Sequence, residues 1–285
     1  MEYKPPRPRI AYNSSCNTDP ANTRKLAGMW DNFVNWEKRL KTEGPFLLRQ
    51  LPRNAKVFDA RAGTGIDSLF LAKNGYAVTC NEPDPNFLEK IKSNSADPKF
   101  PEKARINAGP ESPAPAFTSY SWMNLGQCIQ QRSFDAVICL GNSFTCLMGH
   151  EGMSASLYAF FGILKYGGVL IVDTLNYDHI LDDRKSILRA GNFRYSGNYV
   201  YCGIDRVRTV PLQISEDNMV LEFTDVQTKE TAHLFAYPLR RTELHELLVE
   251  TGFKHVSFFS DYRPVLDTRA DFYQFVCTRC KPEAI

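Results

Sequence analysis

The sequence has no long hydrophobic run and no excess of charge of either sign, and each absence excludes a class of partner. No apolar stretch approaches the length that crosses a bilayer. The 34 Lys and Arg residues against 32 Asp and Glu residues leave a formal charge of +2, too balanced to favour a nucleic-acid partner. The first residues, MEYKPPRPRIAYNSS, lack the apolar segment of a secretory signal. We therefore expect a cytoplasmic protein that binds neither membrane nor nucleic acid.

Paired cysteines are also scarce. The eight cysteines are scattered, mostly within apolar runs such as VICLG and YQFVCTRC, as is typical of buried, reduced thiols. One CxxC spacing, Cys277 to Cys280, falls in a predicted strand without a second pair, so we expect no metal site. The 285 residues, 43% of them hydrophobic, can bury one large core with a sizeable insertion.

What the sequence does contain is an alternation of strand and helix patterns over its first two thirds. A Pro-, Asn- and Ser-rich arm at 1–20 precedes a helical pattern at 21–51, and prolines predict a loop over 96–115. Strands are predicted at 56–60, 76–81, 117–122, 134–140 and 169–173, and helices at 67–73, 87–93 and 154–164. This alternation predicts an α/β fold, in which a mostly parallel sheet has helices on both faces.

Beyond residue 190 the pattern changes to an alternation of polar and apolar residues. Strands predicted at 199–207, 219–226 and 232–237 would form a small antiparallel sheet. A helix at 242–250, ended by Gly252, and strands at 256–260 and 272–278 would complete the α/β domain. We therefore predict an arm and helix at 1–50, an α/β domain at 51–190 and 238–285, and an inserted sheet at 191–237.

The stretch VFDARAGTGIDS, at 57–68, reads as a strand that ends in an acid, a Gly-x-Gly turn and the start of a helix. Such a turn offers backbone N–H groups to a ligand, and Gly63 and Gly65 permit its close approach. The next strand ends at Glu82, where a carboxylate suits the two hydroxyls of a ribose. The pattern therefore predicts a nucleoside-type cofactor, either a nicotinamide dinucleotide or S-adenosylmethionine.

Two residues discriminate between these cofactors. Ser68 stands where a dinucleotide fingerprint requires its third glycine. Asp59 places an acid before the turn, which S-adenosylmethionine tolerates because its sulfonium and ammonium groups are positive. The sequence thus favours S-adenosylmethionine over the cofactor of a nicotinamide-dependent oxidoreductase.

Three longer runs carry a resemblance to a known family. DARAGTGIDSLFLAKNGYAVTCNEPD resembles the cofactor motif of class I methyltransferases, and FDAVICLGNSF and LKYGGVLIVDTLNYDHIL are similar to glycine N-methyltransferase and its glycine/sarcosine relatives. A thinner similarity extends from Trp30 through FAYPLRRTELHELL to the C-terminus. The resemblance implies a Rossmann-like class I methyltransferase fold with a seven-stranded sheet. It also implies S-adenosyl-L-methionine as cofactor and S-adenosyl-L-homocysteine as product, with 1–50 covering the cofactor and 191–237 facing the substrate.

The resemblance further implies which residues contact the cofactor. They are Gly63 and Gly65 along its methionine part, Glu82 on the ribose, Trp122 beside the adenine with Ser121 next to it, Leu140 under the cofactor, and Trp30 with Arg39 or Lys41 over its carboxylate. Ordinary core packing is the alternative for Trp30 and Trp122, and a solvated helix face for Arg39. Arg61 replaces a small family residue; we expect it to tolerate the cofactor or bind its carboxylate, the alternative being a blocked site.

The substrate side departs from the family in two places. Leu175 stands just before NYD, where glycine N-methyltransferase has an arginine that binds the substrate carboxylate, and Phe223 replaces a tyrosine. Loss of a charge-assisted clamp leaves a carboxylate unpaired in an apolar pocket, unless Arg240 or Arg241 takes its place. The groups left for hydrogen bonds to the substrate are Asn142, Tyr201 and Tyr237, the first two as aiming partners of the nucleophile. Packing within the inserted sheet is the alternative for both tyrosines.

These observations predict a methyltransferase that acts on a small molecule. We expect N-methylation of an amine or amino-acid-like substrate other than free glycine. A phenol or similar hydroxyl is the alternative acceptor and would need a base, for which His179 is nearest in sequence. A protein that binds the cofactor without activity is a further alternative. The sequence leaves open whether the chain forms homo-oligomers.

Overall fold

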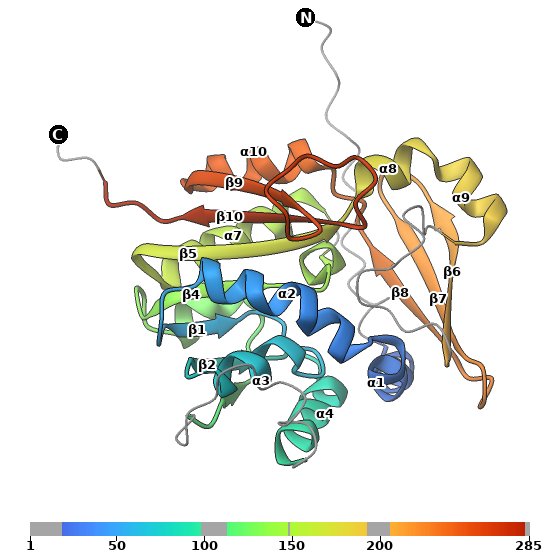
Figure 1. Cartoon of the computed structure of the whole chain (residues 1–285), viewed down its shortest axis with the longest axis horizontal. Coiled ribbons are helices and arrows are strands. Elements are labelled where there is room, and N and C mark those ends of the chain that lie inside the picture. The colour runs from blue at the N-terminus through green and yellow to red at the C-terminus, as the bar shows by residue number, and fades with distance from the viewer. Residues whose placement is uncertain (1–18, 98–112, 148, 193–205, 283–285) are drawn as a thin grey trace, which may run out of the picture.

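The computed structural model of the chain describes residues 19–97, 113–147, 149–192 and 206–282. Its main element is a seven-stranded sheet in the order β3-β2-β1-β4-β5-β10-β9 (Figure 1). The strands are β1 (Lys56–Asp59), β2 (Ala77–Asn81), β3 (Ala116–Thr118), β4 (Phe134–Cys139), β5 (Leu164–Leu175), β9 (Lys254–Ser260) and β10 (Phe272–Thr278). Strands β1 to β5 pair in parallel, and β10 is antiparallel to both of its neighbours. The predicted mostly parallel sheet is confirmed.

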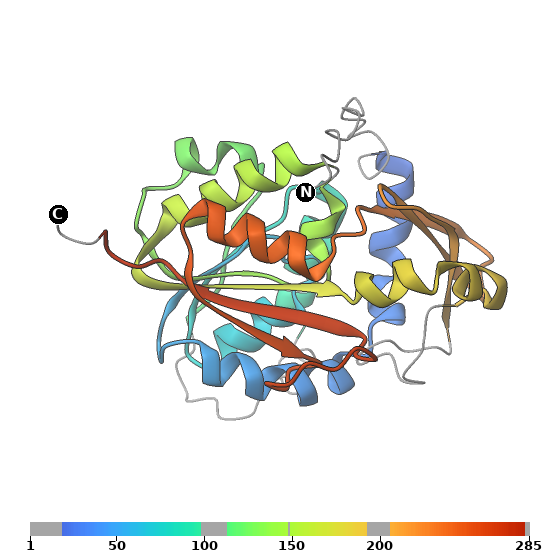
Figure 2. The same ribbon diagram turned by 90° about the horizontal axis from the view of Figure 1, so that it is seen from above.

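Helices cover both faces of this sheet, and each face has its own apolar core (Figure 2). One face carries α2 (Trp36–Gln50), α3 (Ile66–Lys73) and α4 (Pro85–Ala96), and the other carries α6 (Leu125–Cys128), α7 (His150–Ile163) and α10 (Arg241–Thr251). In β4, Ala136 and Ile138 belong to the first core, while Val137 and Cys139 belong to the second. A strand covered on both faces reads as a continuous apolar run, which is why FDAVIC does not alternate.

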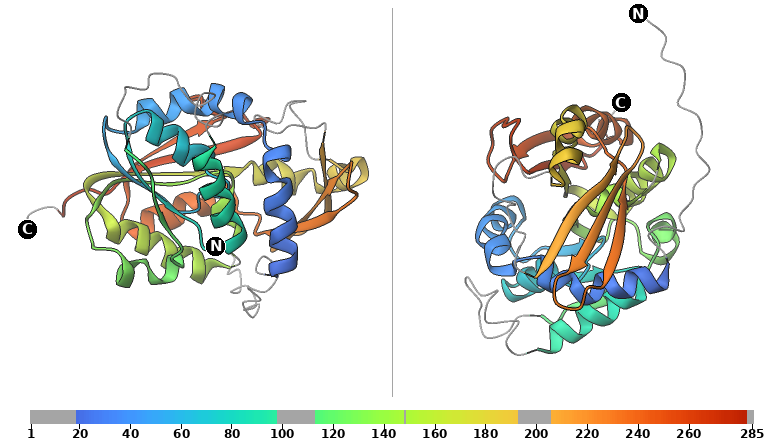
Figure 3. Two further views of the ribbon diagram at one scale, coloured as in Figure 1. Left: turned by 90° about the horizontal axis from the view of Figure 1, so that it is seen from below. Right: turned by 90° about the vertical axis from the view of Figure 1, so that its right-hand side faces the viewer.

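A second, three-stranded antiparallel sheet stands beside the first (Figure 3). It consists of β6 (Val207–Ile214), β7 (Met219–Asp225) and β8 (Thr231–Ala236), and it follows the short helices α8 (Tyr177–Asp182) and α9 (Arg184–Ala190) in the chain. Helix α1 (Pro20–Phe33) packs against β6 and β8 on one side and against α4 on the other. It therefore joins the small sheet to the α/β core. The predicted division into domains stays a prediction.

The structure corrects several predicted elements. The helix predicted at 21–51 is two helices, α1 and α2, because the side chain of Asn35 caps α2 by accepting the N–H of Lys38 at 2.9 Å. The strand predicted at 117–122 ends at Thr118, and Trp122 begins a short 3-10 helix, η1 (Trp122–Asn124). Strand β5 begins at Leu164, five residues before its predicted start, and β6 occupies 207–214, where no strand is predicted beyond its first residue. The arm and the central loop lie mainly outside the described residues.

The described residues also bear on membranes and metals. In these ranges no helix is both long and apolar enough to span a bilayer. Nor do the described side chains include three or more His, Cys, Asp or Glu grouped so as to hold a metal ion. Cys277 of the CxxC spacing is a buried, free thiol in β10.

The strand order creates a crevice at the carboxyl ends of β1 and β4. The connection from β1 leads to β2 on one side of the sheet, whereas the connection from β4 leads to β5 on the other side, so the two connections diverge. Ligands bind at such switch points in open α/β sheets. Three segments meet there: the turn at 60–65 after β1, Glu82 at the end of β2, and the loop at 140–146 after β4.

Candidate functional site

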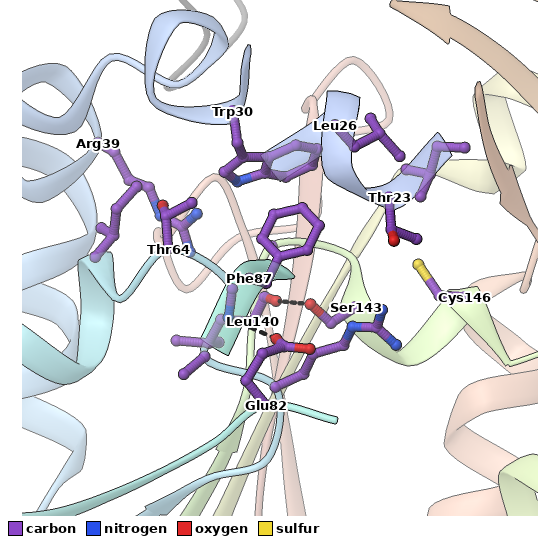
Figure 4. Close-up of a pocket in the computed structure, with 16 residues that line it drawn as sticks. Thr23, Leu26, Trp30, Arg39, Thr64, Glu82, Phe87, Leu140, Ser143 and Cys146 are labelled. Carbon is purple, nitrogen blue, oxygen red and sulfur yellow. Dashed lines mark hydrogen bonds between the residues drawn. The ribbon is translucent and has the colours of Figure 1, made fainter. Parts of the chain in front are cut away.

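A cavity at this crevice has about 730 Å³ of space free of protein atoms, part of it continuous with solvent. Its lining combines the turn after β1 with residues from α1, α2, α4, the loop after β4 and β8 (Figure 4). The lining residues are Thr23, Leu26, Trp30, Arg39, Arg61, Ala62, Gly63, Thr64, Ile66, Glu82, Phe87, Leu140, Gly141, Ser143, Cys146 and Leu234.

Gly63 and Gly65 are required in the turn for different structural reasons. Gly65 has φ +98°, and a Cβ there would lie 2.5 Å from Cγ1 of Ile91 in α4, so both backbone and packing require glycine. Gly63 has φ +57°, but a Cβ on it would meet no atom within 4 Å. Gly65 therefore fixes how the turn packs on α4, and Gly63 keeps open space along the wall of the cavity.

Glu82 is fixed by backbone hydrogen bonds although it lines the cavity. Its Oε2 accepts the N–H of Gly63 at 2.9 Å and its Oε1 accepts the N–H of Asp84 at 3.0 Å. A carboxylate has about four acceptor sites, so further sites remain for the hydroxyls of a ligand. Burial raises the pKa of Glu82, and the guanidinium of Arg61 opposes that rise. The predicted ribose-binding residue thus lies in the cavity with its carboxylate oriented.

Arg61 is half-buried and its side chain also lines the cavity. Its backbone N–H donates to Oδ1 of Asp59 at 3.3 Å, which holds the start of the turn. Burial lowers the pKa of the guanidinium, but the nearby carboxylate of Glu82 opposes this, and the pKa of Arg61 is raised. The side chain is therefore a cation at the cavity, and the carboxylate of Glu82 makes the largest contribution to raising its pKa.

Arg39 lies on the opposite side of the cavity from Cys146 and is held by two carboxylates (Figure 4). Its Nε is 2.5 Å from Oε2 of Glu43, and its Nη2 is 2.6 Å from Oδ2 of Asp67. A Cβ on Gly141 would lie 3.4 Å from Nη1 of Arg39, so glycine at this position leaves room for the guanidinium. Arg39 thus lies at the cavity wall and is already paired, and its predicted contact with the cofactor carboxylate stays a prediction.

Two further carboxyls belong to the same buried cluster. Burial raises the pKa of Asp59 to about 7, and burial together with Glu43 raises the pKa of Asp173 to about 7. Arg39 lowers both values, which shows that one guanidinium is shared among several acids. This excess of carboxyl groups over guanidinium favours a ligand group of positive charge beside it.

Asn142 follows Gly141 but is not among the described residues that line the cavity. Its Nδ2 donates to the hydroxyl of Tyr177 at 2.8 Å, and its Oδ1 accepts the N–H of Leu175 at 2.9 Å. Its own backbone N–H donates to Asp173 at 2.7 Å. Asn142 therefore ties the loop after β4 to the end of β5, and its predicted role in aiming the substrate stays a prediction.

The two residues predicted beside an adenine do not reach the cavity. The indole N–H of Trp122 donates to the carbonyl oxygen of Ala60 at 2.6 Å, and its ring packs on Phe144 and Phe160 in the core beneath α7. Ser121 is exposed and precedes η1. Trp122 thus packs in the core, the alternative considered from the sequence. A role for Trp122 or Ser121 at the adenine stays a prediction.

The predicted substrate residues that the structure describes do not line the cavity. Leu175 is buried at the end of β5, and Phe223 packs behind Trp30, with ring centroids 5.9 Å apart. The hydroxyl of Tyr237 donates to Glu243 at 2.9 Å, and Arg240 forms ion pairs at the surface. Tyr201 lies outside the described residues. The structure gathers the cofactor candidates Trp30, Arg39, Arg61, Gly63, Glu82 and Leu140, but none of these substrate candidates.

Several lining residues are absent from the sequence prediction. Thr23 and Leu26 precede Trp30 by seven and four residues, so the helical period could have placed them on its face. Runs already singled out contain five more: Ala62, Thr64, Ile66, Gly141 and Ser143. Cys146 follows the second of these runs, and no local pattern marks Phe87 or Leu234, which distant elements bring to the cavity.

Comparisons with known proteins identify relatives of the chain. No protein-family model matches it. It is 32% identical over 253 residues to the glycine/sarcosine N-methyltransferase of Aphanothece halophytica, covering 88% of this chain and 86% of that protein. It is 31% identical over 252 residues to the glycine/sarcosine N-methyltransferase of Parasynechococcus marenigrum, covering 88% and 81%. A solved S-adenosylmethionine-dependent methyltransferase from Clostridium acetobutylicum shares the fold, with a TM-score of 0.62 at 16% identity over 94% of this chain and 100% of that chain.

Proposed function

The chain belongs to the family of glycine/sarcosine N-methyltransferases, and from that premise we propose that it methylates the nitrogen of a small amine or amino-acid-like molecule other than free glycine. It is an S-adenosylmethionine-dependent methyltransferase with a Rossmann-like fold. The observation that carries the choice of acceptor is Leu175, an apolar side chain buried at the end of β5, where glycine N-methyltransferase has an arginine.

The residues of the cavity fit S-adenosylmethionine. Oγ1 of Thr64 is buried without a hydrogen-bond partner among the described residues, and Thr64 lines the cavity. Glu82 has acceptor sites left for ribose hydroxyls, and the carboxyl groups around Arg39 suit a positive ligand group. When bound, the cofactor supplies a methyl group on a positively charged sulfur that a nucleophile displaces in line.

The contribution of the chain is alignment and exclusion of water. The rings of Trp30 and Phe87 meet edge to face at 5.9 Å and close one side of the cavity (Figure 4). An amine nucleophile needs only to be neutral and aimed, whereas a phenol also needs a base. His179 is on α8 and binds Asp183 at 3.1 Å, and it is not among the described cavity residues. Its position supports nitrogen over oxygen as the methyl acceptor.

The positions of the arginines support an acceptor other than glycine. Leu175 stands where glycine N-methyltransferase has its arginine, and the two replacements considered from the sequence are engaged elsewhere. Arg240 pairs with Asp182 at 3.1 Å, and Arg241 is 3.7 Å from Asp178. Within the described lining, Arg39 and Arg61 are the guanidinium groups, and both have carboxylate neighbours. The apolar side chain of Leu175 instead favours an acceptor with a hydrocarbon or aromatic body, by about 25 cal/mol per Å² buried.

The proposal is tested by a panel of acceptors at equal concentration, with S-adenosylhomocysteine formation as the readout. The panel contains glycine, sarcosine, arylalkylamines and phenols. We expect an amine with an apolar body to react best and glycine at least about tenfold more slowly, since a charge-assisted contact is worth about 1.5–3 kcal/mol. Glycine as the best acceptor would overturn the proposal. Reaction of phenols alone would assign oxygen, and binding of S-adenosylhomocysteine without any turnover would indicate an inactive protein.

A further inference from the structure

The two guanidinium groups of the cavity have unequal surroundings. Arg39 is bound by Glu43 and Asp67 at 2.5 and 2.6 Å, and Asp173 adds a third carboxyl nearby. Glu43 and Asp67 thus already occupy two of the five N–H donors of Arg39 that a ligand carboxylate would need. Among the described residues the guanidinium of Arg61 has no carboxylate oxygen within 4.0 Å, although the carboxylates of Glu82 and Asp84 raise its pKa. Arg61 is therefore the less closely paired cation of the two.

Glu82 does not depend on Arg61 for its position. Backbone N–H groups of Gly63 and Asp84 hold its two oxygens at 2.9 and 3.0 Å. Hydroxyl donors from a ribose can occupy acceptor sites that these bonds leave over. The guanidinium of Arg61 can thus bind a ligand, and the carboxylate of Glu82 still keeps its hydrogen bonds.

The place of Arg61 in the chain also suits an anionic ligand group. It stands two residues before Gly63, in the turn along which the methionine part of the cofactor is expected to lie. Its long side chain carries a planar fork of N–H donors that matches a carboxylate in a bidentate manner.

We propose that Arg61 binds the carboxylate of the methionine part of S-adenosylmethionine while Glu82 binds the ribose. Arg61 then has the role that family resemblance assigns to Arg39, and Arg39 serves to hold Glu43 and Asp67 in position. This inference rests on the proposed function only in requiring this cofactor, and it is independent of the methyl acceptor.

The test is calorimetry with two ligands that differ in one group. S-Adenosylhomocysteine carries the carboxylate, and its decarboxylated analogue keeps the amine and lacks the carboxylate. The variant Arg61→Met removes the charge and retains the length of the side chain. We expect it to weaken S-adenosylhomocysteine by about ten- to a hundredfold and to change the affinity of the analogue by less than about threefold. The difference between the two ligands should shrink at high salt.

Two further variants complete the design. Arg61→Lys, which keeps the charge without the fork, should fall between the wild type and Arg61→Met. Arg240→Met, outside the cavity, should leave both affinities unchanged. Equal losses or equal gains for both ligands in Arg61→Met would overturn the inference and leave the cofactor assignment standing. Failure of the wild type to bind either ligand would overturn both.

Discussion

Replacement of Asn142 by alanine should destabilise the fold by about 2–4 kcal/mol. The side chain accepts the N–H of Leu175 and donates to Tyr177, both of which are buried. Alanine would leave the N–H of Leu175 without a partner, at about 1–3 kcal/mol. It would also have to adopt φ +64°, a left-handed conformation that costs a residue with a Cβ about 1 kcal/mol or more. The hydroxyl of Tyr177 keeps its contact with Thr145 at 3.2 Å, so the lost hydrogen bond to Tyr177 contributes the smaller part of the destabilisation.

Asn142→Gly is the matched control for this prediction. Glycine adopts the same backbone conformation freely, so this variant should lose only the hydrogen bonds and be more stable than Asn142→Ala by roughly 1 kcal/mol. Urea unfolding followed by tryptophan fluorescence measures both variants, since the chain contains three tryptophans. If Asn142→Ala lies within about 1 kcal/mol of the wild type, or Gly is no better than Ala, the assignment of Asn142 as an anchor is wrong.

Three further predictions concern the glycine turn and its acids. Glu82→Ala should weaken S-adenosylhomocysteine by about 1–3 kcal/mol in calorimetry, and unchanged affinity would mean that the ribose is held elsewhere. Gly65→Ala should lower the free energy of unfolding by about 2–4 kcal/mol because its Cβ meets Ile91, whereas Gly28→Ala, in α1 with nothing within 4 Å, should leave it unchanged or raise it slightly; equal effects would refute the packing argument. Burial raises the pKa of Asp59 from 3.8 to about 7, so the native protein holds a proton that the unfolded chain loses between those values. The contribution of Asp59 to stability is therefore greatest in acid and falls as pH rises through about 7. Relative to Asp59→Asn, the wild type should lose stability in urea titrations from pH 5 to pH 8, and a gain would contradict the raised pKa.

The sequence predicts those parts of the fold that depend on local pattern. Strand β10 has the predicted bounds, Phe272–Thr278, because it is mostly apolar and is buried between two neighbouring strands. The break between α1 and α2 escapes prediction since the apolar period continues across the Asn35 cap. Trp122 has a high strand propensity, but its hydrogen bond to Ala60 holds it in η1 instead.

The same division holds for the site. Gly63 and Glu82 follow from one motif and its spacing, and the structure brings them within 2.9 Å of each other. Leu234 and Phe87 reach the cavity only because β8 and α4 pack around α1, which no local pattern encodes. Phe223 packs against Trp30, which lines the cavity, and its predicted place in the substrate wall stays a prediction.

The choice of acceptor is tested most directly by a competition experiment. The protein is incubated with S-adenosylmethionine carrying a deuterated methyl group and equal concentrations of glycine and an arylalkylamine, and the labelled products are measured by mass spectrometry. We expect the label on the nitrogen of the arylalkylamine to exceed that on glycine by at least about tenfold. Equal or greater labelling of glycine would contradict the account, because it would mean that a cation in the site binds the glycine carboxylate despite Leu175.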